Sequence, residues 1–185
     1  MSGLGRHQQA ALVSFGPSGE APAVILFQYN PEVLTRSFVS PAGPTGVPPP
    51  MQQVLSFTMA LDAIDLGADI DPVGQVLGIM PTLSELEELM EKSQSSAPPT
   101  TFLVWGPYRL LPVQVMELVI RETEFNEALA PVRAHVDIGL RVLDDIAESA
   151  STSARQVWKD HQSARKSMQS PEPGPIPDYL KRMLK

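Results

Sequence analysis

The chain has 185 residues, of which 43% are hydrophobic and 19% charged, a composition typical of a folded protein rather than a disordered one. Its net charge of −7 argues against nucleic acid as the main partner, because phosphate binding requires a basic surface. There is no cysteine, and no apolar run approaches the roughly 20 residues of a membrane span or forms a signal peptide. We therefore expect a cytoplasmic protein without disulfides and without direct membrane insertion.

The charges are unevenly distributed along the chain. Residues 1–148 contain 7 Lys and Arg against 18 Asp and Glu, whereas residues 149–185 contain 7 against 3. Two interpretations of the basic segment remain open. It is either a solvated helix with ordinary surface cations, or an arm that docks on an acidic surface of its own or of a neighbouring subunit.

An apolar strand beginning near Ala23 is the first predicted element, after a flexible N-terminus at residues 1–19. This strand ends at Asn30-Pro31-Glu32. Asn-Pro initiates a turn, Pro31 has no backbone donor, and Asn30 is restricted to extended geometry. A second extended run continues through Arg36, so the sequence predicts two strands that meet at a fixed corner.

The proline-rich segment 41–50 predicts an exposed loop, and the strict alternation over residues 54–62 predicts a half-buried strand. The inward side chains of that strand are Leu55, Phe57, Met59 and Leu61. The segment 64–80 spaces aspartates as calcium loops do, but its glycines and glutamates do not fall at the required positions. We expect an irregular acidic connector there rather than a metal site.

A short helix is predicted next, with Thr82 and Glu85 as its capping box. Its apolar face contains Leu83, Leu86, Leu89 and Met90.

Two further strands follow a Ser/Pro loop. Residues 101–105 are continuously apolar and stop at Gly106, which predicts a strand buried on both faces. The long run 113–125 is predicted to contain a bulge, because its apolar phase shifts between Val115 and Met116.

After a turn at 126–131, residues 134–142 alternate most regularly and predict the last strand of the sheet. Its inward residues are Val136, Ile138, Leu140 and Val142.

Beyond Asp144 the period changes to that of a helix, predicted over residues 147–170. Its narrow apolar stripe needs a docking surface, because such a helix is unstable alone. The stripe consists of Ala154, Val157, His161, Ala164 and Met168, with Trp158 beside it. Residues 171–185 form a stiff proline-rich spacer and a short amphipathic tail, which is either a recognition segment or a frayed end.

The sequence contains no recognisable catalytic motif. His7, His135 and His161 have no metal-ligand spacing, and no activated serine motif is present. Glu122 and Glu124 share a strand face, but a solvated surface pair is favoured over acid–base chemistry. We expect a non-enzymatic protein without catalytic, cofactor-binding or metal-binding residues.

The order of several motifs is more specific than any one of them. Phe27-Gln28-Tyr29-Asn30-Pro31-Glu32 is followed by a strand that ends Leu61-Asp62, then by Trp105-Gly106-Pro107 and by Pro131-Val132-Arg133-Ala134. Over about residues 20–146 this series resembles the tube-like N-terminal domain of baseplate proteins of contractile injection systems, the phage-tail-like machines of bacteria. The resemblance implies a homo-oligomer, expected to be a hexameric ring, between the spike or hub protein and the inner tube protein, in contact with baseplate wedge proteins. Many such proteins continue into a LysM module, which we do not expect here because eight residues follow Pro177.

The expected fold is therefore α+β and β-dominated: an antiparallel sheet or partial barrel of about five or six strands with one packed helix, and a C-terminal helical arm. The expected function is structural, as a baseplate or tube-initiating ring protein in a phage-tail-like particle that is released or membrane-associated. The alternatives are a tube or tail-terminus adaptor at another axial position, or an unrecognised small-ligand-binding or enzymatic domain.

Two groups of residues are expected to matter most. The structural corner or subunit interface contains Gln28, Asn30, Pro31, Arg36, Trp105, Gly106 and Arg133, with pinning of the corner favoured over binding of a neighbour. The partner-docking arm contains Val157, Trp158, His161, Tyr179, Leu180, Met183 and Leu184.

Overall fold

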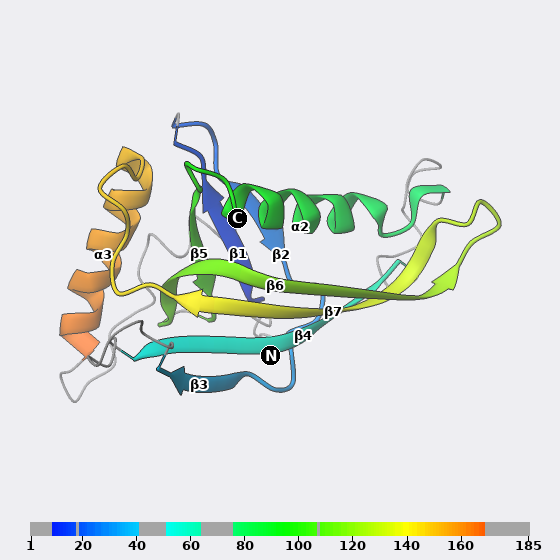
Figure 1. Ribbon diagram of the computed structural model, residues 1–185, viewed down its shortest axis with the longest axis horizontal. Helices are drawn as coiled ribbons and strands as arrows, with labels where there is room; N and C mark the ends of the chain where they lie inside the picture. Colours follow the sequence, from blue (N-terminus) through cyan, green and yellow to red (C-terminus); the bar gives the residue numbers. More distant parts are fainter. Residues whose placement is uncertain (1–8, 18, 41–50, 64–75, 107, 169–185) are drawn as a thin grey trace, which may run out of the picture.

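A single open antiparallel sheet of seven strands, in the order β2-β1-β5-β6-β7-β4-β3, makes up most of the described chain (Figure 1). The computed structural model describes residues 9–17, 19–40, 51–63, 76–106 and 108–168. The strands are β1 (Ala11–Phe15), β2 (Ala23–Leu26), β3 (Thr35–Val39), β4 (Gln52–Asp62), β5 (Thr100–Val104), β6 (Leu110–Phe125) and β7 (Pro131–Val142). The helices are α2 (Met80–Ser93) and α3 (Thr152–Met168). The predicted β-dominated α+β class is confirmed, with seven strands in place of the expected five or six.

Three predicted segments lie outside the described residues wholly or in part. They are the proline-rich loop 41–50, most of the acidic connector 64–80, and the spacer and tail at 171–185.

The sequence analysis missed β1, which occupies the middle of one half of the sheet. This strand pairs with β2 on one side and β5 on the other, with Leu12 opposite both Ile25 and Leu103. The expectation of a flexible N-terminus over residues 1–19 is therefore wrong for residues 11–15. A five-residue apolar run has too little length to show a period, and its partner β5 lies far away in the sequence.

The β6–β7 hairpin is the longest feature of the sheet and projects beyond the other strands (Figure 1). Its register shifts between Val115 and Glu117, which confirms the predicted bulge. At the tip, the side-chain oxygen of Asn126 accepts hydrogen bonds from the backbone N–H groups of Ala128 and Ala130. The turn predicted at 126–131 is thus closed by an asparagine, as its chemistry favours.

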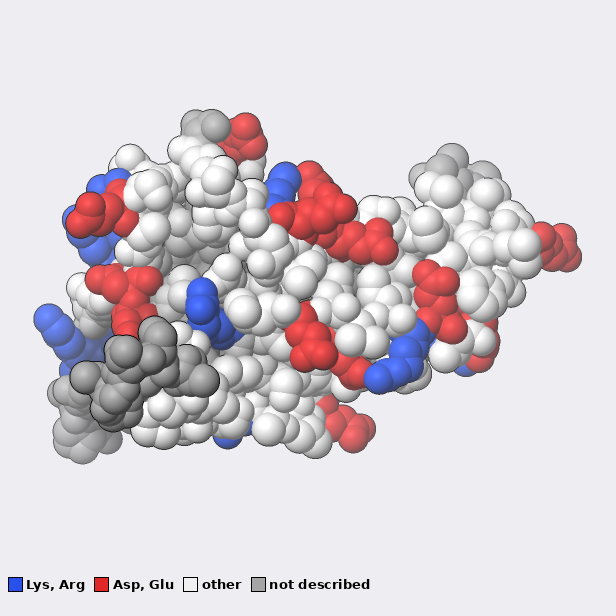
Figure 2. Space-filling model, viewed as in Figure 1, with Lys and Arg blue, Asp and Glu red and all other residues white. Residues whose placement is uncertain are grey.

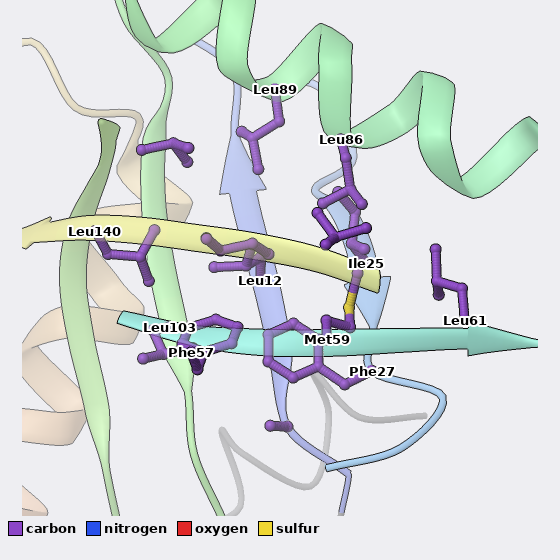
Figure 3. Packing of buried hydrophobic residues seen from close by; sticks show 14 of the residues in the cluster. Leu12, Ile25, Phe27, Phe57, Met59, Leu61, Leu86, Leu89, Leu103 and Leu140 are labelled. Atoms are coloured by element: carbon purple, nitrogen blue, oxygen red, sulfur yellow. The ribbon is translucent and has the colours of Figure 1, made fainter. Parts of the chain in front are cut away.

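The main core fills the inner face of the bent sheet and is covered by α2. Figure 3 shows Leu86 and Leu89 pointing from α2 towards Leu12 and Ile25. The alternation predicted for β4 is confirmed, because its inward side chains are all at most 5% exposed. In β7 the same holds for Val136, Ile138 and Leu140, whereas Val142 is only partly buried.

Helix α2 begins earlier than its sequence predicts, and the capping box of Thr82 with Glu85 is wrong. The N-cap residue is Ile79, which makes no side-chain capping bond, and Pro81 lies in the first turn, where its missing N–H has no cost. The Ile79 N–H donates to the Pro131 carbonyl (3.0 Å). Gly78 has φ +56° and would bring a Cβ to 2.2 Å from the same carbonyl, so contact with β7 decides where the helix starts.

Helix α3 covers the opposite face of the sheet and forms a second core. Ala150 and Ala154 pack there against a surface of β1, β5 and β6 that includes Phe15, Phe102 and Leu110. Strand β5 contributes Leu103 to the main core but Phe102 and Val104 to the second, which confirms its predicted burial on both faces. No helix in the described ranges combines the length and apolarity needed to cross a membrane.

Replacing Leu86 by Ala should lower the free energy of unfolding by about 2–4 kcal/mol, because the cavity lies between α2 and the sheet. Urea unfolding followed by circular dichroism measures the change. The exposed Glu87 on the same helix provides the matched control, and Glu87→Ala should change stability by less than about 0.5 kcal/mol. Equal effects of both substitutions would contradict the described burial of α2.

Candidate functional site

The chain that leaves β2 is bound to the chain that enters β1. The Phe27 N–H donates to the Ala10 carbonyl (2.9 Å), and the Asn30 side-chain oxygen accepts from the Ala10 N–H (2.7 Å). Asn30 therefore satisfies a backbone donor 20 residues earlier, rather than facing a ligand. We call residues 27–31 the corner segment.

Gln28 joins the corner segment to β4, a strand near the other end of the sheet. Its side-chain N–H donates to the Asp62 carbonyl (2.7 Å), while its side-chain oxygen accepts from the Asp62 N–H (2.8 Å). The amide group thus pairs with one backbone residue through two hydrogen bonds, as a neighbouring strand would. Because β2 and β4 are separated by four strands in the sheet order, this pairing holds the sheet in its bent shape.

Arg133 engages the side chain of the same aspartate. Its Nε lies 2.7 Å from Asp62 Oδ2, and its Nη1 lies 2.5 Å from Glu124 Oε1. The hydrogen bond and charge of Asp62 raise the pKa of Arg133, with Glu124 adding to the effect. Asp62 is therefore held by its backbone to Gln28 and by its side chain to β7.

The two motifs behind the family resemblance meet through aromatic side chains. Phe27 packs edge-on to Trp105 with ring centroids 6.5 Å apart, and Phe57 lies between them in sequence and contacts both rings, at 5.3 and 5.8 Å. Trp105 begins the turn into β6, with its N–H donating to the Arg109 carbonyl (2.8 Å). Gly106 has φ +67°, which favours glycine at this turn.

The structure therefore brings together most of the expected corner residues. The corner segment itself contains Gln28 and Asn30. Trp105 packs against Phe27 of this segment, and Arg133 binds Asp62, the partner of Gln28. Arg36 lies apart, on the exposed strand β3. Sequence reasoning noted the strand end at Asp62 but missed its role, because a side chain that pairs with a distant backbone leaves no local pattern.

A groove of about 820 Å³ opens beside the corner segment, on the sheet face opposite the main core. One wall is the stretch from Tyr29 to Val33, and small outward residues of β4 and β7 leave the space. Thr58 donates to Asp137 (2.6 Å), and Arg121 lies 2.6 Å from the other oxygen of that carboxylate. The Thr58 hydrogen bond, followed by Arg121, lowers the pKa of Asp137. Both oxygens are thus engaged in structure, which disfavours Asp137 as a general base.

In α3, the described residues of the expected arm pack on this chain's own sheet. The Trp158 ring stacks on Phe102 and on His161, at 6.1 and 5.8 Å, and its N–H donates to Asp145 (2.7 Å). His161 is 4% exposed. Burial, with a smaller contribution from Arg165, lowers the pKa of His161 to about 4. The other arm residues, Tyr179, Leu180, Met183 and Leu184, lie outside the described part of the chain.

No similarity to a known protein assigns a function to these features. No model of a known protein family matches the chain, and no curated protein matches it. In the described ranges, no three His, Asp or Glu side chains are grouped closely enough to hold a metal ion.

Gln28→Glu should destabilise the protein by about 1–3 kcal/mol, because a carboxylate oxygen replaces the donor that faces the Asp62 carbonyl. Chemical unfolding measures the loss. The same change at Gln162, on the exposed face of α3, should alter stability by less than about 0.5 kcal/mol. A neutral Gln28→Glu variant would show that the pairing with Asp62 does not hold the sheet.

Stability should fall as the pH decreases from about 6.5 to about 4. His161 has a folded-state pKa of about 4 against an ordinary value of 6.5, so the unfolded chain binds a proton first in this window. Urea titrations at several pH values measure how the free energy of unfolding changes with pH in the wild type and in His161→Gln. The carboxylates contribute equally to both proteins, so the difference between the two slopes isolates His161. His161→Gln should flatten the slope, whereas His135→Gln, at an exposed position, should retain it. Identical slopes in all three proteins would contradict the burial of His161.

Proposed function

We propose that this protein is a non-enzymatic structural component of a contractile injection system. In this proposal it forms a ring, a hexamer by the family resemblance, that links the spike hub to the inner tube and to the surrounding baseplate. It is made in the cytoplasm and acts within the assembled particle. An adaptor at another axial position of the same particle would use the same surfaces.

The open sheet with two different exposed edges is the observation that carries the proposal. A closed ring of identical subunits requires a head-to-tail contact, in which each copy presents two distinct surfaces. Strands β2 and β3 end the sheet on its two sides and carry the unpaired backbone groups of edge strands. All five residues of β3 are exposed, including Phe38 at 58% and Val39 at 43%. Apolar side chains on an unpaired edge favour contact with another chain.

The rigid corner supports the same role. A ring subunit that transmits force needs edges held at a fixed angle, and the corner segment holds β2 relative to β4 through Gln28 and Phe27. The motif residues that carry the family resemblance therefore have a structural role in this proposal, because they hold the strands in position.

The far end of the β6–β7 hairpin offers a surface for contacts along the axis of the particle. Phe125 and Leu129 are 51% and 79% exposed there. Asn126 donates to the carbonyl of Val76, which is itself 55% exposed, so the segment before α2 joins the same apolar end. Such a projecting apolar end fits a role in contacting the next ring.

Phe38→Asp should lower incorporation into particles by about tenfold or more, because a desolvated charge at the edge costs at least about 1.4 kcal/mol per contact. The protein is co-expressed with sheath, tube and spike subunits, and purified particles are quantified by mass spectrometry and negative-stain microscopy. Met116→Asp, at an exposed apolar position inside the sheet, is the matched control and should assemble normally. A wild-type protein that stays monomeric and never joins the particle would overturn the proposal.

A further inference from the structure

We infer that the groove beside the corner segment is occupied by residues 176–185 of the same chain. This docking goes beyond the proposed role in assembly and does not depend on it.

The groove is lined by exposed apolar side chains and by acidic ones, among other polar residues. Tyr29, Val33 and Val119 line it and are 38%, 66% and 38% exposed, so they present apolar area that the described chain leaves uncovered. Glu32 and Glu117 also line it and are both exposed. The other charges are Asp137 and Arg121, which neutralise each other.

Glu117 is held in place by the backbone beneath it. A Cβ built on Gly139 would lie 3.0 Å from the Glu117 Cβ, so the glutamate packs closely over the glycine of β7. A carboxylate oxygen of Glu117 would lie 3.3 Å from the same Cβ, so the side chain extends over Gly139.

Residues 176–185 have the complementary chemistry. Their apolar side chains are Ile176, Tyr179, Leu180, Met183 and Leu184. Three cations, Lys181, Arg182 and Lys185, outnumber the one carboxylate of Asp178. A segment rich in apolar side chains and with more cations than carboxylates is complementary to a groove lined by exposed apolar side chains and two glutamates.

The position of α3 favours this groove over the other acidic surface of the molecule. Figure 2 shows acidic side chains gathered over α2, where Glu88 already pairs with Lys92 at 2.6 Å. In Figure 1, however, α3 runs from the level of α2 down to the side where β3 and β4 lie, so the C-terminal end of this helix lies away from α2 in this view. Residues 169–175 join α3 to the docked segment and can span up to about 25 Å, and this short connection raises the local concentration of the segment at the groove.

Site-specific photo-crosslinking in the full chain tests the inference directly. With p-benzoylphenylalanine in place of Tyr179, mass spectrometry should find crosslinks to residues 29–35, 56–60 and 117–121. Mixing isotopically heavy and light protein at low concentration should give crosslinks within one copy only. The crosslink yield should fall at high salt, since screening removes the attraction between charges.

Charge reversal provides the specificity control. Glu32→Lys with Glu117→Lys should lower the yield at least about fivefold, and Lys181→Glu with Arg182→Glu should do the same, whereas combining the four changes should restore it. The matched pair Glu87→Lys with Glu91→Lys, on the exposed face of α2, should leave the yield unchanged. Circular dichroism confirms that each variant is folded.

Crosslinks to α2, crosslinks between heavy and light copies, or no crosslinks would each overturn the inference. None of these outcomes bears on ring formation, which the particle assay measures separately.

Discussion

The bend of the sheet depends on one side-chain amide, which makes the pair of backbone hydrogen bonds that a neighbouring strand would make. Gln28, which follows β2, pairs with the backbone of Asp62 in β4, and four strands lie between β2 and β4 in the sheet order. The chain between β2 and β3 already joins the two ends of the sheet, and the pairing of Gln28 with Asp62 fixes the path of this connection. Phe27, the residue before Gln28, packs against Phe57 and Trp105, so packing and pairing act on the same segment.

A second constraint is the position of β5 between two cores. Phe102 and Val104 face α3, whereas Leu103 faces the core under α2. One strand therefore couples the C-terminal helix to the bent sheet, and a change in the docking of α3 is felt by the main core. The stacked rings of Phe102, Trp158 and His161 make this coupling dependent on a neutral imidazole.

These constraints leave the functional surfaces at the margins of a fixed body. The edges β2 and β3, the end of the hairpin and the groove beside the corner segment all carry exposed apolar side chains. Within the groove, the carboxylate of Asp137 is held by Thr58 and Arg121. A fixed centre with exposed apolar side chains at the margins is compatible with the proposed role in an assembly.

The sequence alone determined every element with a long or regular pattern. The alternation of β4 and β7, the bulge after Val115 and the apolar face of α2 follow from local side-chain periods, which need no knowledge of partners. Only the tertiary structure decided β1, the start of α2 and the role of Asp62. In each case a distant contact determines the local structure: β5 for the short β1, the Pro131 carbonyl for Ile79, and the Gln28 amide for Asp62. Such contacts depend on which distant segments the fold brings together, so the local order of side chains does not reveal them.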